Sequence, residues 1–219
     1  MNSNYKVLKY RSNKTNEVDD SISIEEPLEI IIKFKEKSVW IENTISITMR
    51  TPGNDEDLVR GFLFNEQIIE KIEYIDKIES SGENVGQYNL KNKIIATINN
   101  SENVDIDKIK RNFLTNSSCG VCGKTSLDSL EVIKKDKILK TLPKITHQII
   151  MKSPAILRKN QSEFSKTGGI HASGLFSDKG NVIAIKEDVG RHNALDKLIG
   201  YVLEKKLLNP SNQFLTCSG

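Results

Sequence analysis

The sequence predicts a mixed α+β protein, with a strand-rich first half followed by an α/β second half. Residues 41–49 alternate apolar and polar side chains, which is the period of a half-buried strand. In the second half, strand-like apolar runs precede a segment whose apolar pairs recur at helical spacing: Ala194/Leu195, Leu198/Ile199 and Val202/Leu203. These two periodicities distinguish the first half of the chain from the second.

The first half is expected to contain strands at residues 28–34, 41–49 and 94–98, with the turn-rich segment SSGENVGQ before the last of them. Residues 51–54 are expected to form a turn that leads into a helix. That helix opens with Asp55, Glu56 and Asp57, and acidic residues in a first turn suit the positive end of the helix dipole.

The second half is expected to begin with a helix that Ser153 caps, with Pro154 at its first helical position, ending near Phe164. Strands are expected at residues 170–176, 182–185 and 214–217, and a helix after Gly190. Asp196 and Lys197 fall on the polar face of that helix. Cys217 is expected to behave as a small hydrophobe within its strand.

Polar, charged sequence between about residues 100 and 118 separates the two halves, as is typical of a domain boundary. We therefore predict an N-terminal, mainly β domain at residues 1–112 and a second domain at residues 113–219. Lys plus Arg number 32 against 29 for Asp plus Glu, a balance too even to indicate a nucleic-acid or membrane partner.

No apolar run approaches the about 18 residues that a membrane-spanning helix needs, and the first residues do not resemble a secretory signal. The chain has three cysteines, an odd number, and two of them lie only three positions apart. A disulfide scaffold is therefore not expected, and the composition indicates a reducing, cytoplasmic environment.

Cys119 and Cys122 lie in the segment SSCGVCGKTS, and two thiols at this spacing can reach one another. Lys124 and a helix expected to begin near Thr125 would both stabilise a thiolate, which is the nucleophilic form. Such a pair can carry a sulfane sulfur, cycle as a disulfide or supply half of a zinc site. The plainer alternative is two small thiols buried in a tight turn. A phosphate-binding P-loop is excluded, because its first glycine would fall at Ser118 and no buried strand precedes it.

A zinc site would need further ligands, and neither His171 nor His192 stands at a compact ligand spacing from the cysteines. A zinc deaminase would need a glutamate two positions after a ligand histidine and a second pair of closely spaced cysteines. Ala194 stands two positions after His192, and the second cysteine pair does not occur. The sequence therefore predicts no permanently bound metal.

Two other segments have the chemistry of a binding site. Gly168 and Gly169, before His171, allow a ligand close to the backbone, although a plain turn before a buried strand would look the same. The second segment, Lys186 to Asn193, follows a strand and opens a helix, where backbone N–H groups and the helix dipole favour anions. A helix cap with solvated charges is the alternative for that segment.

Four runs taken together closely resemble the formate dehydrogenase accessory sulfurtransferase family, FdhD/NarQ: TPGNDEDLVRGFLFNEQII, SSCGVCGKTSL, TGGIHASGLF and KEDVGRHNALDKLIG. They occur in the family's order and extend over nearly the whole chain. The resemblance implies a sulfurtransferase that accepts persulfide sulfur from a cysteine desulfurase. It implies transfer to the molybdenum of bis(molybdopterin guanine dinucleotide) before that cofactor enters the formate dehydrogenase apoenzyme.

By the same resemblance, Cys119 would bear the persulfide and Cys122 would be its relay or resolving partner. The family's second domain is similar to the cytidine deaminase fold, in agreement with the helix–strand–strand–helix–strand order expected here, and the resemblance implies a homodimer. Members of the family continue beyond Ser218-Gly219, so we expect an incomplete second domain, lower stability and poor cofactor binding.

A cofactor with two nucleotide tails needs anion sites, and the chemistry of the residues nominates eight to face it: Gly168, Gly169, His171, Asp188, Gly190, Arg191, His192 and Asn193. Two other functions stay open at this point. One is a zinc- or dithiol-dependent cofactor-binding module without sulfur transfer. The other is an assembly chaperone that only shields the cofactor.

Overall fold

The computed structural model describes residues 2–86, 88–99, 102, 104–105 and 143–218. The mixed α+β class is confirmed, since three β-sheets and four α-helices occur within these residues. The expected domain boundary lies outside the described residues. The likeness of the second half to cytidine deaminase stays a prediction.

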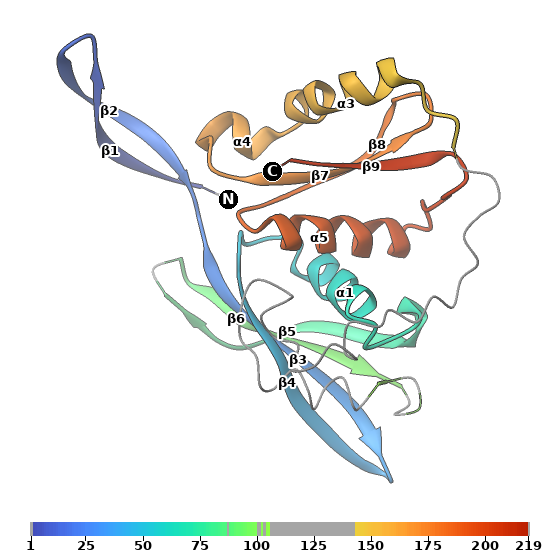
Figure 1. The fold of residues 1–219 in the computed structure, drawn as a ribbon. Helices are drawn as coiled ribbons and strands as arrows, with labels where there is room; N and C mark the ends of the chain where they lie inside the picture. The colour runs from blue at the N-terminus through green and yellow to red at the C-terminus, as the bar shows by residue number, and fades with distance from the viewer. Residues whose placement is uncertain (1, 87, 100–101, 103, 106–142, 219) are drawn as a thin grey trace, which may run out of the picture.

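The elements are stacked in layers (Figure 1). A four-stranded sheet, in the order β4-β3-β6-β5, packs against α1 (Asp55–Asn65), and α1 packs in turn on α5 (Arg191–Glu204). The other face of α5 contacts a three-stranded sheet in the order β8-β7-β9. Beyond that sheet lie α3 (His147–Lys159) and α4 (Ser162–Thr167). None of the described helices is long and apolar enough to span a bilayer.

The four-stranded sheet consists of β3 (Glu26–Glu36), β4 (Val39–Arg50), β5 (Ile75–Val85) and β6 (Leu90–Ile98), with a short 3-10 turn, η1 (Ile72–Tyr74), before β5. Alternate residues of β3 are buried, and β6 runs parallel to it. Their apolar side chains form the main core with α1: Leu28, Ile30, Ile32, Phe34, Ile94, Ala96, Ile98, Leu58, Val59 and Leu63. The strands expected at residues 28–34, 41–49 and 94–98 are thus confirmed.

The segment SSGENVGQ is not a simple turn, because most of it belongs to β5. Ser80 pairs with Ile94 and Asn84 with Lys91, across an irregularity between Ser81 and Asn84. Pairing with β6 outweighs the low strand propensity of these polar residues, since strand formation depends on neighbouring strands more than on local preference.

A two-stranded hairpin, β1 (Asn2–Arg11) and β2 (Lys14–Ser23), projects from the rest of the molecule (Figure 1). Its turn is formed by Ser12 and Asn13, whose φ angles of 50° and 60° are those of the tight turns that favour hairpins. At its base, the hydroxyls of Ser23 and Thr167 are 2.7 Å apart, so this end of the hairpin lies against α4.

The expected start of the helix at Ser153 is wrong. The helix α3 begins at His147, and the side chain of Thr146 accepts a hydrogen bond from the backbone N–H of Ile149. Pro154 lies inside this helix and has no N–H for the carbonyl of Ile150, four residues earlier. The Ser153 hydroxyl donates to that same carbonyl at 2.9 Å, which explains how the helix tolerates the proline.

The three-stranded sheet consists of β7 (His171–Ser177), β8 (Val182–Asp188) and β9 (Gln213–Cys217), as the sequence predicts, and β7 pairs antiparallel with both neighbours. On one face Leu175 packs with residues of α5, including Leu198 and Val202. On the other face Leu157 of α3 packs with Phe176. The sheet is therefore covered by helices on both faces.

The helices α1 and α5 approach so closely that their backbones touch. A Cβ at Gly61 would lie 1.9 Å from the carbonyl oxygen of Asp196, and one at Gly200 would lie 1.9 Å from that of Asp57. A side chain at either position would overlap the partner helix. Two glycines therefore allow the first half of the chain to pack directly on the second.

Candidate functional site

The two cysteines that the sequence nominates, Cys119 and Cys122, lie outside the described residues, so their roles stay predictions. The eight residues nominated for the cofactor are all described. They come from two segments that are separate in sequence, one at the end of α4 and one at the start of α5.

Strand pairing brings these two segments together. His171, the first residue of β7, stands opposite Asp188, the last residue of β8. Side chains alternate along a strand, so His171 shares a face with Leu175, which packs on α5. His171 therefore lies on the α5 side of the sheet, at the end where that helix begins.

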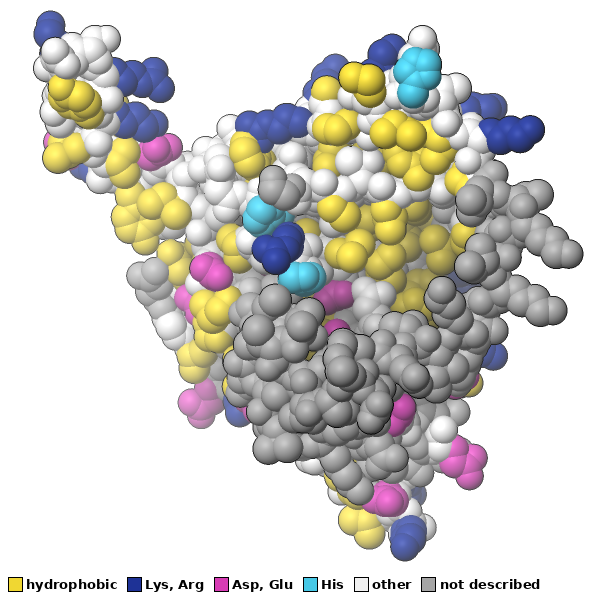
Figure 2. All heavy atoms as spheres, in the orientation of Figure 1, with side chains coloured by type: hydrophobic (Ala, Val, Ile, Leu, Met, Phe, Trp, Pro, Cys, Tyr) yellow, Lys and Arg dark blue, Asp and Glu magenta, His cyan; other side chains and the backbone are white. Residues whose placement is uncertain are grey.

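The start of α5 presents basic groups at the surface. Arg191 and His192 are exposed, and His171 is half-buried. Figure 2 shows histidine side chains next to a basic side chain near the middle of one face of the molecule. The first N–H groups of a helix have no intrahelical partners, so this end of the sheet can attract and orient an anion.

Gly168 and Gly169 lie between the end of α4 and His171, the first residue of β7. Gly168 ends α4 in the left-handed conformation (φ 69°, ψ 0°), which glycine adopts without steric cost. A Cβ at Gly168 would meet nothing within 4 Å, and one at Gly169 would meet only a carbonyl oxygen at 4.0 Å. The backbone here is open to a ligand.

Asp188 points inward and is fully buried. One carboxylate oxygen accepts from the N–H of Gly190 at 2.9 Å and from the side chain of Asn193 at 3.2 Å. The other accepts from the N–H of Thr51 at 3.1 Å and pairs with the Lys197 ammonium at 2.7 Å. Four donors therefore satisfy this carboxylate, and all of them belong to the protein.

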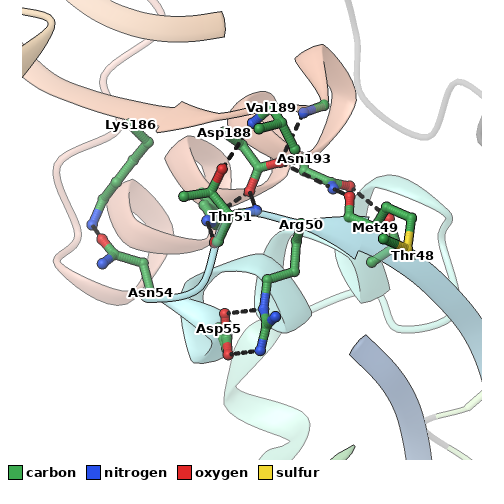
Figure 3. A network of polar contacts seen from close by, with 12 residues as sticks. Thr48, Met49, Arg50, Thr51, Asn54, Asp55, Lys186, Asp188, Val189 and Asn193 are labelled. Carbon is green, nitrogen blue, oxygen red and sulfur yellow. Dashed lines mark hydrogen bonds and ion pairs between the residues drawn. The ribbon is translucent and has the colours of Figure 1, made fainter. Parts of the chain in front are cut away.

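Asn193 is used in the same way (Figure 3). Its amide nitrogen donates to the carbonyl of Met49 at 2.7 Å, and its amide oxygen accepts from the Thr48 hydroxyl at 3.1 Å. Both partners belong to the end of β4. Asp188 and Asn193 thus join the start of α5 to the first half of the chain, while Arg191 and His192 between them face outward.

The expectation that Lys197 lies on a polar face is wrong, since its exposed fraction is 2%. Its ammonium contacts Asp188 and donates to the carbonyl of Thr51 at 2.7 Å. Asp196 lies where α1 crosses α5 and accepts a hydrogen bond of 2.6 Å from Asn65. Burial raises the pKa of the Asp196 carboxyl from 3.8 to about 7. The cause is that α1 covers the side of α5 that an isolated amphipathic helix would expose.

Several residues that support this region are not among those nominated from the sequence. Arg50, with an exposed fraction of 1%, makes two 3.0 Å hydrogen bonds to the carboxylate of Asp55. Lys186 donates to Asp57 at 2.8 Å and to Asn54, and its ammonium lies 4.1 Å from the centre of the Tyr201 ring. Complementary charge in the sequence could have indicated these contacts. An acidic helix start and a lysine-bearing segment occur in two of the four runs that resemble the family.

Cys217 belongs to a strand, as expected, but its side chain is exposed, which a small hydrophobe would not be expected to be. It lies on β9, an edge strand of the described sheet, and its sulfur accepts a hydrogen bond of 3.4 Å from the Ser173 hydroxyl. Within the described residues, no group of three or more His, Cys, Asp or Glu side chains is arranged to hold a metal ion.

Comparison with known proteins identifies close relatives. The chain is 42% identical over 202 residues to the sulfur carrier protein FdhD of Picrophilus torridus, a match that covers 92% of this chain and 71% of the relative. It is 36% identical over 215 residues to the sulfur carrier protein FdhD of Sulfolobus acidocaldarius, covering 98% and 74% of the two chains.

The fold is similar to the crystal structure of a Desulfotalea psychrophila protein described as a formate dehydrogenase accessory protein. The TM-score is 0.60 at 20% identity, and the similarity covers 100% of this chain and 73% of the other. A sequence model of the FdhD/NarQ family matches residues 24–219. The chain therefore belongs to the FdhD/NarQ family.

Proposed function

We propose that this protein is a sulfur carrier in the maturation of formate dehydrogenase, with Cys119 and Cys122 as its sulfur-bearing residues. The observation that carries this proposal is the match to relatives named sulfur carrier proteins. One such match extends over 98% of this chain. A match of that extent also spans the segment that contains Cys119 and Cys122. The proposed sulfur donor is a cysteine desulfurase, and the proposed setting is the cytoplasm.

The proposed chemistry is thiol–persulfide exchange. The Cys119 thiolate attacks the terminal sulfur of the donor's persulfide, one S–S bond forms as the donor's S–S bond breaks, and the donor leaves as a thiolate. Cys122 can take the sulfur from Cys119 by a second exchange of the same kind. Neither step needs an external oxidant or reductant, because one S–S bond replaces another.

The proposed acceptor is the molybdenum of bis(molybdopterin guanine dinucleotide), which would be a bound substrate and not a resident cofactor. Its phosphates would lie against the exposed side chains of Arg191 and His192, with His171 beside them. Gly168, Gly169 and Gly190 would let the backbone approach them. The pairing of His171 with Asp188, which brings these residues to one end of a sheet, supports this placement. Formate dehydrogenase apoenzyme and a second copy of the chain are proposed as partners.

Sulfur transfer can be tested by incubating the protein with a cysteine desulfurase and cysteine, followed by mass spectrometry of its peptides. We expect an added sulfur atom on Cys119 or Cys122, and the same yield in Cys217→Ser, which removes the exposed third thiol. The double variant Cys119→Ser/Cys122→Ser should carry no added sulfur.

Other outcomes would support the alternatives. One zinc ion per chain with no sulfur adduct would indicate a zinc-dependent module. Full formate dehydrogenase activity with Cys119→Ala, measured in cells that lack the native protein, would favour a chaperone that only shields the cofactor. Either result would refute the sulfur-carrier proposal.

A further inference from the structure

Thr51 bonds to the second half of the chain through all three of its polar atoms (Figure 3). Its N–H donates to Asp188 at 3.1 Å, its hydroxyl oxygen accepts from the N–H of Val189 at 3.1 Å, and its carbonyl accepts from Lys197 at 2.7 Å. The residue is 4% exposed, so water does not compete for these bonds. Among the described residues of the first half, only Thr51 bonds to residues 188–197 through every one of its polar atoms.

These partners lie on both sides of the outward-facing residues. Asp188 and Val189 precede Arg191 and His192, and Lys197 follows them on α5. The carboxylate that Thr51 contacts also accepts from the N–H of Gly190. Thr51 therefore bonds to the chain on both sides of the exposed basic groups.

Thr51 is itself held in place by its neighbours. Arg50 is anchored by Asp55 and donates to the carbonyl of Glu26 at 3.2 Å. Pro52 follows Thr51, and a residue before proline is restricted to extended conformations. Thr51 thus has little freedom to follow a movement of the turn.

We propose that Thr51 is a positioning residue, which fixes the orientation of Arg191 and His192 toward an anionic ligand without touching that ligand. Only the identity of the ligand in this inference rests on the proposed function. Loss of the Thr51 hydroxyl would leave the part-buried N–H of Val189 without its acceptor, which is unfavourable unless the turn moves. A moved turn would misplace the two basic side chains.

The test compares three variants. Thr51→Val keeps the shape and removes the hydroxyl, and Thr51→Ser keeps the hydroxyl. Thr44→Val is the matched control, because Thr44 lies on β4, the strand that ends just before Thr51, and donates to Glu29 at 2.7 Å, within the first half. Amide hydrogen exchange reports on residues 189–193 directly and needs no ligand.

We expect exchange at residues 189–193 to become at least about fivefold faster in Thr51→Val, the factor that corresponds to one lost hydrogen bond. Exchange at residues 28–34 should stay unchanged, and Thr51→Ser and Thr44→Val should resemble the wild type in both segments. Equal exchange in Thr51→Val and Thr51→Ser, or a uniform increase over the chain, would overturn the proposal.

Guanosine diphosphate, as a probe of the nucleotide tails, gives a second readout. We expect Thr51→Val to weaken its binding about fivefold, with rescue in Thr51→Ser and no change in sulfur loading of the cysteines. If the wild type does not bind the probe, hydrogen exchange alone decides whether Thr51 positions the turn.

Discussion

The buried carboxylate of Asp188 and the buried ammonium of Lys197 form an ion pair 2.7 Å long, with exposed side-chain fractions of 0% and 3%. Burying two charges is costly, and such a pair persists only when further hydrogen bonds complete it. Here three neutral donors complete the carboxylate, and a carbonyl accepts from the ammonium. Removing one partner of such a pair typically costs about 3–5 kcal/mol, so these residues are needed for the structure whatever ligand binds nearby.

Asp196 gives the molecule a pH-dependent stability. Burial raises its pKa from 3.8 to about 7, and the nearby charges of Glu66 and Asp188 add to the increase, whereas the Asn65 hydrogen bond opposes it. Between these two values the folded chain binds a proton that the unfolded chain has lost. Stability from this group is therefore full below about pH 4 and decreases as the pH rises toward 7.

We predict that Asp196→Asn removes this loss. At pH 8 the variant should be more stable than the wild type by about 1–3 kcal/mol, since each pKa unit corresponds to about 1.4 kcal/mol and solvent screening reduces the total at a half-buried site. At pH 4 the two should be equal. Urea unfolding at both pH values measures this, with Asp76→Asn on exposed β5 as the control. A gain of the same size at both pH values would contradict the explanation.

At the scale of elements, the crossing of α1 and α5 depends on two glycines. Glycine inside a helix costs about 0.5–1 kcal/mol relative to alanine, so its presence at both contact points needs a packing reason. The carbonyl oxygens of Asp196 and Asp57 supply that reason, because each lies only 1.9 Å from where a Cβ would be. The low helix propensity of these two glycines is therefore offset by the close approach of α1 and α5.

Gly200→Ala should therefore destabilise the protein, although alanine favours a helix. We predict a loss of about 1–3 kcal/mol, typical of an overpacked core, measured by thermal or urea unfolding. Gly169→Ala is the control for stability alone, because a Cβ there would meet only a carbonyl oxygen, at 4.0 Å. Unchanged or increased stability of Gly200→Ala would show that the helices can separate at little cost.

At the scale of the whole molecule, the two halves share one interior contact region. α1 contributes to the core of the four-stranded sheet and also packs on α5, which covers the other sheet. Polar bonds from Thr48 and Met49 to Asn193 of α5, and from Thr51 to Asp188 of β8, reinforce this contact. Neither half can lose its central helix without exposing the other.

We predict a single cooperative unfolding transition. Trp40 is the only tryptophan of the chain and belongs to β4, so its fluorescence reports on the first half. Far-ultraviolet circular dichroism reports on helices of both halves. Coincident urea midpoints by the two probes are expected for one cooperative unit, and two separate midpoints would show that the halves unfold independently.

Much of the element order follows from local pattern. The buried alternation of β3 and the helical apolar spacing of α5 are both visible in the sequence, because each periodicity is a property of neighbouring residues. The start of α3 was misplaced, because Ser153 and Pro154 also form a plausible helix start. What decides against it is a hydrogen bond from Ser153 to the carbonyl that Pro154 leaves free.

The sequence by itself determined the family, through four motifs in order, and nominated the cysteine pair and the Gly168–His171 and Asp188–Asn193 segments. Only the tertiary structure decided which of those polar residues face outward. Asp188, Asn193 and Lys197 are buried because α1 and the end of β4, far away in sequence, cover one side of the start of α5. Local periodicity contains no information about such a distant partner, so the sequence could not separate these inward-facing residues from Arg191 and His192.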